Sequence, residues 1–241
     1  MTRKHSARPS ARPRTVVRRT PVKVAAALVV AGLAVSACGS VKMGAAAITG
    51  PERISSSTLT DQVANLRAAY RVDAAKGIKP QRTTRQEVQQ VLTWLILFRI
   101  YDKIAAQHGI SVTPAQADKQ LSGLTTQAAQ SKATLDEYVS AAGAVPPDLI
   151  PQLGQYFAIL SALEGKIDGG KVPTSTAQQS KVQAGVSHAQ CLASKSLGVQ
   201  VNPQWGVFDY ASYAVVPAPP TLAANPSPAP SSSPPVLHPP C

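Results

Sequence analysis

The stretch TRQEVQQVLTWLILFRIYDKIAAQHG, residues 84–109, decides the fold of this chain of 241 residues. Thr84 and Glu87 have the spacing of a capping box and Gly109 is a typical C-terminal stop, so the pattern predicts a helix over residues 84–108. One apolar stripe of this helix consists of Val88, Val91, Leu92, Leu95 and Ile96. A second stripe, on another side, consists of Trp94, Leu97, Phe98 and Tyr101.

A helix with two apolar sides is either buried centrally or faces something other than water. The first interpretation makes residues 84–108 the central core helix of the domain. The second makes part of the second stripe the lining of a groove for apolar segments of client proteins. The candidate binding residues are then Trp94, Leu97, Phe98 and Tyr101.

The segments that precede this helix predict two short strands and a further helix. Gly50-Pro51 marks a turn between strands over 45–49 and 52–54. The polar residues at 55–58 are good N-caps for a helix that ends at Gly77. Its apolar positions recur at helical spacing and form one buried face: Leu59, Val63, Leu66 and Tyr70.

The segments that follow predict four more helices and a strand. Thr113-Pro114-Ala115-Gln116 begins a polar helix to about residue 130, which we expect to be peripheral. Thr134 and Glu137 cap a short helix that ends at Gly143. Longer helices are predicted from Pro146-Pro147 to near residue 169 and over 175–197, followed by a strand over 199–201.

The net charge of the chain is +12, which would suggest a polyanion-binding protein if it were spread over one face. Eight of the 24 basic residues fall within the first 23 positions, with no acidic residue among them. From Cys38 onward there are 16 basic and 12 acidic residues, a net charge of +4. Aromatic residues are 5% of the chain, few for a base-stacking surface. We therefore expect no nucleic-acid partner.

The basic head precedes an uncharged apolar run over residues 24–37. This run is shorter than the roughly 20 residues of a membrane-spanning helix, and the pattern is typical of a secretory signal peptide. The sequence Val35-Ser36-Ala37-Cys38-Gly39 resembles the bacterial lipobox, in which the signal is cut before a cysteine that receives a diacylglyceryl group. We predict a signal peptide over 1–37, lipidation at Cys38 and a lipidated tether over 38–44.

These features predict an extracytoplasmic protein, lipid-anchored to the outer face of the cell membrane through acylated Cys38. Arg18-Arg19 also allows twin-arginine export, but Thr20-Pro21-Val22 lacks the expected hydrophobic pair, which favours general secretion. Residues 217–241 contain 10 of the 21 prolines. Such a composition buries too little apolar surface to fold. We expect a disordered Pro-rich tail over 217–241 and a folded domain over 45–216.

The sequence contains no pattern that indicates catalysis or metal binding. It has no C-x-x-C pair, Walker loop or dinucleotide glycine motif. The segment at 185–189 comes near the nucleophile elbow of serine hydrolases, but it ends in Ala189 and lies in a helical pattern. We expect no enzyme activity, metal, cofactor or small-molecule substrate. For Cys191 and Cys241 three states stay open: a disulfide between them, a free terminal thiol, and a bridge between molecules.

Three segments then occur in a fixed order: ERIS at 52–55, GISVTPAQAD at 109–118 and VQVNPQWGVFD at 199–209. Together they are similar to the N-terminal domain of SurA and of PrsA-type foldase lipoproteins of high-GC Gram-positive bacteria. The resemblance covers about residues 45–210. It implies a helical chaperone module in which the strand at 45–49 pairs near residues 199–201. The chain has no room for the parvulin domain of longer relatives, so the resemblance implies no isomerase activity.

The fold class that follows is mainly α, a helical SurA-N-like domain with a small two- or three-stranded β element joining its N- and C-terminal ends. The expected function is chaperone-like binding of unfolded or exported proteins. The alternative is a non-catalytic cell-envelope scaffold or adaptor that binds one dedicated partner.

Overall fold

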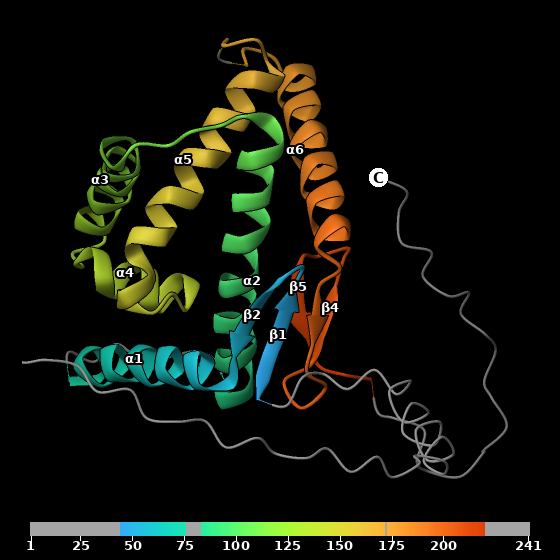
Figure 1. Cartoon of the computed structure of the whole chain (residues 1–241). Coiled ribbons are helices and arrows are strands. Elements are labelled where there is room, and N and C mark those ends of the chain that lie inside the picture. Colours follow the sequence, from blue (N-terminus) through green and yellow to red (C-terminus); the bar gives the residue numbers. More distant parts are fainter. Residues whose placement is uncertain (1–43, 76–82, 172, 220–241) are drawn as a thin grey trace, which may run out of the picture. The chain divides into compact units, whose positions relative to one another are not determined.

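The structure, a computed structural model, describes residues 44–75, 83–171 and 173–219. Within these ranges the chain is mainly helical, with short antiparallel strands (Figure 1). The helices are α1 (Ser56–Ala75), α2 (Thr84–His108), α3 (Pro114–Gln130), α4 (Leu135–Gly143), α5 (Ile150–Ile167) and α6 (Thr176–Leu197), with a 3-10 turn η2 (Pro147–Leu149). The strands are β1 (Ala45–Thr49), β2 (Glu52–Ser55), β3 (Gln200–Val201), β4 (Val207–Asp209) and β5 (Ala214–Val216). The predicted mainly α fold with a small β element is confirmed.

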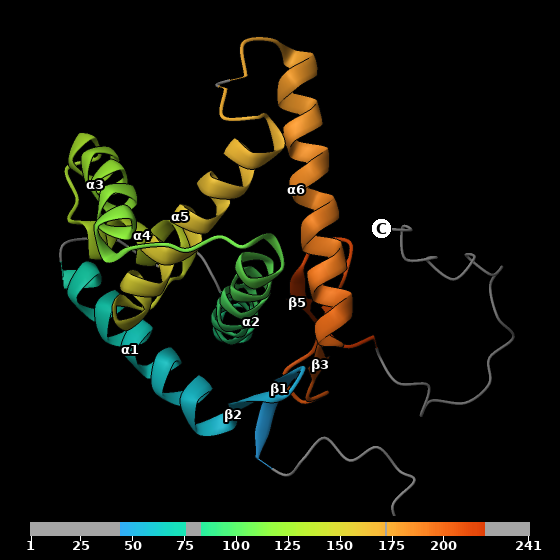
Figure 2. The same ribbon diagram turned by 45° about the horizontal axis from the view of Figure 1, so that its top comes forward.

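Helix α2 is the centre of the domain. It packs against α1, α5, α6, β1 and β5, with α3 and α6 on opposite sides of it (Figures 1 and 2). Solvent does not reach five of its apolar side chains: Val91, Leu92, Ile96, Ile100 and Ile104. The interpretation of residues 84–108 as the central core helix is confirmed.

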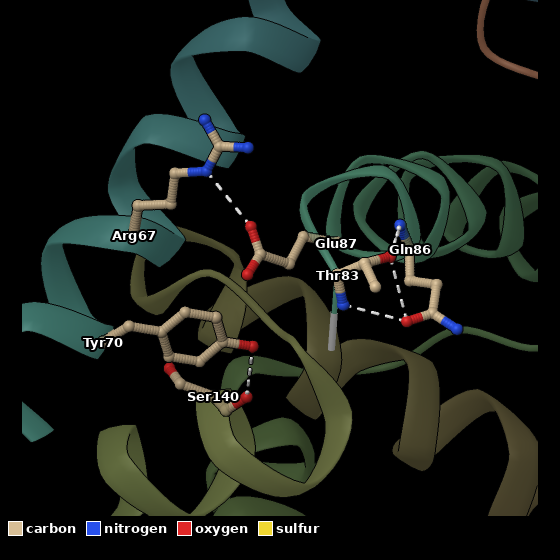
Figure 3. A network of polar contacts seen from close by, with 6 residues as sticks. All are labelled: Arg67, Tyr70, Thr83, Gln86, Glu87 and Ser140. Carbon is tan, nitrogen blue, oxygen red and sulfur yellow. Dashed lines mark hydrogen bonds and ion pairs between the residues drawn. The ribbon is translucent and has the colours of Figure 1, made fainter. Parts of the chain in front are cut away.

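The cap of α2 differs from the predicted one by one residue. Thr83, not Thr84, is the N-cap, and Gln86 occupies the position that the prediction gave to Glu87. The Thr83 backbone N–H donates to Gln86 Oε1 at 2.9 Å, and the Gln86 N–H donates to Thr83 Oγ1 at 3.4 Å (Figure 3). A glutamine at N3 closes a capping box as well as a glutamate does, so the Glu87 carboxylate is available for another contact.

This contact is an ion pair between Glu87 of α2 and Arg67 of α1, which joins the two helices. The Glu87 carboxylate is buried and accepts a hydrogen bond from Arg67 Nε at 3.1 Å (Figure 3). One turn further along α1, the Tyr70 hydroxyl donates to the carbonyl of Ser140 in α4 at 3.2 Å. A buried carboxylate without a partner would be costly, so this ion pair fixes where the second half of α1 lies.

The sheet brings the two ends of the domain together, as the resemblance implied. Its strand order is β2-β1-β3, all antiparallel, with Ala47 opposite Val201 and Ile48 opposite Gln200. Asn202 extends the pairing, because its backbone N–H donates to the Ala46 carbonyl at 2.9 Å and its side chain donates to the Ala45 carbonyl at 3.1 Å. The predicted pairing of 45–49 with 199–201 is confirmed.

The strand β1 starts with three alanines, Ala45, Ala46 and Ala47, none of which is reached by solvent. Strand β1 packs against α2. Small side chains allow a strand backbone to approach a helix closely, and this explains an alanine run at a buried position where larger β-branched residues are the commoner choice.

A second ladder, β4 with β5, is absent from the sequence-based expectations. Val207 lies opposite Val216, and the backbone N–H of Val215 donates to Thr93 Oγ1 of α2 at 2.9 Å. Gly206 opens this ladder at φ +140°, where a Cβ would collide with the Val216 carbonyl, so only glycine fits there. The hairpin anchors the end of the described domain to α2.

Helices α3 and α4 form the outer part of the domain with α5. In α3 only Ala128 is buried, which confirms that this helix is peripheral. It crosses α5 at Gly154, where a Cβ would come within 2.9 Å of the Leu121 side chain. Helix α4 ends at Gly143, as predicted, but the residue in the left-handed C-cap conformation is Ala144, with φ +50°.

Cys191 is buried in α6 and forms a disulfide, which excludes a free thiol at this position. The other two cysteines, Cys38 and Cys241, lie outside the described residues, as do the predicted signal peptide, the tether up to residue 43 and most of the predicted tail. Among the described residues, no helix is both long and apolar enough to cross a membrane.

Candidate binding cleft

A cleft of about 330 Å³ opens between the α1–β2 corner and α5, with α2 at its base. It is lined by residues from β2 (Arg53, Ile54), α1 (Thr58, Gln62), α2 (Leu95, Phe98, Arg99, Tyr101, Asp102), η2 (Leu149) and α5 (Gln152, Gln155, Tyr156, Ile159). The apolar lining residues come mainly from α2 and α5, and the polar lining residues come from β2, α1, α2 and α5.

The floor of the cleft is aromatic. Tyr156 of α5 lies beside three rings of α2, with centroid distances of 4.3 Å to Tyr101, 5.8 Å to Trp94 and 6.3 Å to Phe98. Tilted and edge-to-face pairs of this kind add to the stabilisation gained from burial alone. Burial raises the pKa of Tyr101 and of Tyr156. Both phenols therefore stay protonated and uncharged at neutral pH.

The charged groups on the rim are paired with one another. Arg99 Nε lies 3.0 Å from a Glu52 oxygen, and Arg99 Nη1 lies 3.8 Å from Asp102 Oδ2. Gln155 Nε2 donates to the other Asp102 oxygen at 3.5 Å. Arg53 is also engaged in an interaction. The cleft therefore presents an apolar floor and a rim whose charges already have partners.

Burial raises the pKa of Asp102 above its ordinary value of 3.8; Arg99 lowers this pKa and Glu52 adds to the increase. The folded protein therefore holds the proton of Asp102 more tightly than the unfolded chain, and it loses stability as the pH rises through the raised pKa. We expect Asp102→Asn to raise the Tm at pH 7. The gain should vanish below pH 3.8, where the carboxyl is protonated in both states.

Thermal unfolding between pH 3 and pH 8 measures this effect, with the exposed Asp61 of α1 changed to Asn as the matched control. A lower Tm for Asp102→Asn at pH 7 would show that the contacts of Asp102 with Arg99 and Gln155 outweigh its burial, contrary to the direction of the pKa shift.

The four candidate residues of the second stripe do not share one surface. Phe98 and Tyr101 line the cleft, but both are buried, with 8% and 2% of their surface exposed. Leu97 is partly buried against the main core. Trp94 lies on another hollow, described below. The four residues lie on one face of α2, but different neighbours cover that face: α4 contacts Trp94, and α5 lies beside Phe98 and Tyr101 in the cleft.

A second hollow of about 210 Å³ surrounds Trp94. It is lined by Leu124, Tyr138, Val139, Ala142, Gly143, Val145, Leu153 and Phe157 together with Trp94. The Trp94 indole N–H donates to the Gly143 carbonyl at 2.9 Å and holds α4 to α2. Trp94 thus joins helices, and of the predicted candidates only Phe98 and Tyr101 contribute to the larger cleft.

Gln62, Gln152, Tyr156 and Ile159 line the cleft but were not among the predicted candidates. Leu149, Gln152, Tyr156 and Ile159 recur at steps of 3, 4 and 3 along the chain, which is a helical face that the sequence does contain. No such signal marks Gln62, because its place in the cleft depends on how α1 packs against the rest of the domain.

No group of three or more His, Cys, Asp or Glu side chains that could hold a metal ion occurs in the described ranges. The near match to a nucleophile elbow lies inside α6, where the Ser187 carbonyl accepts a hydrogen bond from the Tyr213 hydroxyl at 3.2 Å. A serine in the middle of a helix lacks the exposed strand-to-helix turn of that motif.

The fold and the cleft together define a class: a mainly helical domain, closed by a small antiparallel sheet, with an aromatic-floored cleft on one side. No family model, no curated protein and no solved structure matches the chain.

Proposed function

We propose that this protein is a membrane-anchored, extracytoplasmic lipoprotein that binds unfolded segments of exported proteins in the manner of a SurA-type N-terminal chaperone domain, without isomerase activity. The observation that carries this proposal is the cleft between α1, α2 and α5, with its apolar floor and internally paired rim charges. An unfolded client offers apolar side chains together with main-chain amides, and such a cleft accommodates both.

The sheet topology supports the proposal. The strand that follows the tether pairs with the segment that precedes the NPQWG sequence, which is the arrangement that the resemblance implies. The cleft is small, so it would hold one or two side chains of a client at a time. Binding would therefore be weak and reversible, which suits a holdase that releases its clients.

The experiment is suppression of aggregation. The mature protein without its lipid, with Cys38→Ser and the signal peptide removed, should slow the aggregation of a reduced, denatured client at low micromolar concentration. It should also bind a permanently unfolded client such as carboxymethylated lactalbumin. No binding at several hundred micromolar would contradict the proposed function. A single tight cellular partner would favour the scaffold alternative.

The lipid anchor gives a separate prediction about the cysteines. Thioether attachment of diacylglycerol to Cys38 uses its thiol, so that of the three cysteines only Cys241 remains as an intrachain partner for the disulfide of Cys191. Non-reducing tryptic maps should join peptides 182–195 and 196–241, and reduction should separate them.

Mass spectrometry of the membrane-extracted protein tests the lipidation of Cys38 directly. The mature chain should begin at Cys38 and carry the mass of its acyl groups. A disulfide that contains Cys38, or a mature chain that begins at an unmodified Ala37 or Gly39, would contradict lipidation.

A further inference from the structure

The cleft wall contains an amide group without a hydrogen-bond partner. Gln62 of α1 lines the cleft, and its Oε1 is buried and accepts no hydrogen bond within the part of the chain that the structure describes. Buried side-chain oxygens in native proteins nearly always have a donor, and an exception calls for an explanation. The oxygen is closed off from solvent in the free protein, so a ligand in the cleft can supply the missing donor only when the amide turns toward it.

The polar neighbours of Gln62 on the same edge of α1 are already used within the protein. Thr58 Oγ1 lies 2.8 Å from the Ser55 hydroxyl, and Asn65 Oδ1 accepts from the Asp148 backbone N–H at 3.2 Å. Thr58, Gln62 and Asn65 lie one helical turn apart in succession, so they share an edge of α1. Of these three side chains, Gln62 is the one whose oxygen has no donor within the described residues.

The ligand group that fits this position is uncharged. Arg99 is held by Glu52 and Asp102, Asp102 is also held by Gln155, and Arg53 is engaged. A charged ligand would have to break one of these pairs to find a counter-charge. A neutral amide N–H next to an apolar side chain meets no such cost.

We infer that Gln62 recognises the main chain of the bound client. Its amide turns outward from the wall of the cleft and accepts a hydrogen bond from a client backbone N–H, while a neighbouring apolar client side chain lies on the floor formed by Phe98, Tyr101, Tyr156 and Ile159. This inference rests on the proposed function. Every residue except proline offers a backbone N–H, so the ligand class is an extended, uncharged polypeptide segment, with little dependence on its sequence.

The test uses Gln62→Met, which keeps the length of the side chain and removes its amide. The probe is an end-capped eight-residue peptide of alternating leucine and serine. Loss of one neutral hydrogen bond should weaken its binding roughly five- to tenfold. The free protein should gain thermal stability, because a buried unpaired acceptor is gone. Gln183→Met, at an exposed glutamine of α6, is the matched control and should change neither value.

Peptides methylated at one backbone nitrogen at a time complete the test. For the unsubstituted protein one methylated position should weaken binding by the same factor as Gln62→Met. For Gln62→Met that same peptide should show no further loss, which identifies the pair of groups in contact. If methylation at every position affects both proteins equally, or if Gln62→Met binds the parent peptide unchanged, the inference is wrong. If the unsubstituted protein does not bind the parent peptide, the proposed function itself fails.

Discussion

Substitution of Gln152 by Trp should weaken client binding by more than tenfold and leave the domain folded. Gln152 is an exposed residue on the first turns of α5 and lines the cleft. An indole ring at this position can lie on the aromatic floor next to Tyr156 and occupy much of the 330 Å³ that a client side chain would need. Loss of a buried apolar contact of the size of a leucine side chain corresponds to about 1.5–3 kcal/mol, or more than tenfold in affinity.

The matched control is Ser161→Trp, which adds the same ring at an exposed position of α5 outside this cleft. Binding of the leucine–serine peptide, followed by calorimetry or fluorescence anisotropy, should be unchanged in the control. Equal affinities of Gln152→Trp and of the unsubstituted protein would show that clients bind elsewhere, and the hollow around Trp94 would then be the next site to test.

The largest effect on stability is expected from Ile100→Ala. Solvent does not reach Ile100, which lies in the main core on the central helix. Removal of such a side chain costs about 2–5 kcal/mol, because the transfer free energy is lost and a cavity remains. For a domain of this size, Tm falls by roughly 2–4 °C per kcal/mol, so a decrease of about 4–20 °C is expected.

Leu97→Ala is the appropriate comparison, since Leu97 belongs to the same helix and is only partly buried. Its cost should be clearly lower than that of Ile100→Ala, and its circular-dichroism spectrum should be native. Thermal and urea unfolding measure both. Equal destabilisation by the two changes would contradict the position of α2 in the domain.

Much of the fold follows from local signals. Gly50-Pro51, Thr113-Pro114 and Gly198 mark the ends of elements, and the structure has boundaries at each of them. These residues act through backbone conformation and local caps, which depend on few neighbours. The strand pairing of β1 with β3 follows from the family resemblance, because nothing local specifies a contact such as that of Ala47 with Val201, far apart in the sequence.

Two features that the sequence did not predict correctly, the cap of α2 and the β4–β5 ladder, depend on contacts between distant parts of the chain. Glu87 matches a capping pattern with Thr84, but Gln86 serves the cap equally well, and the ion pair with Arg67 on another helix decides the outcome. The β4–β5 ladder was missed because its strands are three residues each and one adjoins the proline-rich segment.

The binding site was predicted only in part, for a related reason. Hydrophobic periodicity shows that α2 is apolar on two sides, but it does not show which neighbour covers each side. Helix α4 covers Trp94, and α5 leaves Phe98 and Tyr101 at the base of a cleft. Gln62 lies on α1, where the sequence pattern makes every polar position look solvent-exposed. Only the packed structure shows that the Gln62 oxygen is buried without a partner, whereas Thr58 and Asn65 have hydrogen bonds.

The chaperone and scaffold hypotheses make different demands on the same cleft. A chaperone needs a site that accepts many segments weakly, and this is consistent with paired rim charges and a main-chain acceptor. A dedicated scaffold gains specificity from charges or polar groups that only one partner satisfies. The number of proteins that contact the cleft in the cell therefore separates them.

The most direct measurement is photo-crosslinking in living cells, with benzoylphenylalanine placed at position 152 in one strain and at position 161 in another. If the cleft binds unfolded clients, position 152 should capture many unrelated exported proteins and position 161 should capture few. The captured segments should be apolar and uncharged. A single dominant adduct at position 152, or the same adducts at both positions, would contradict the claim that this cleft binds unfolded clients.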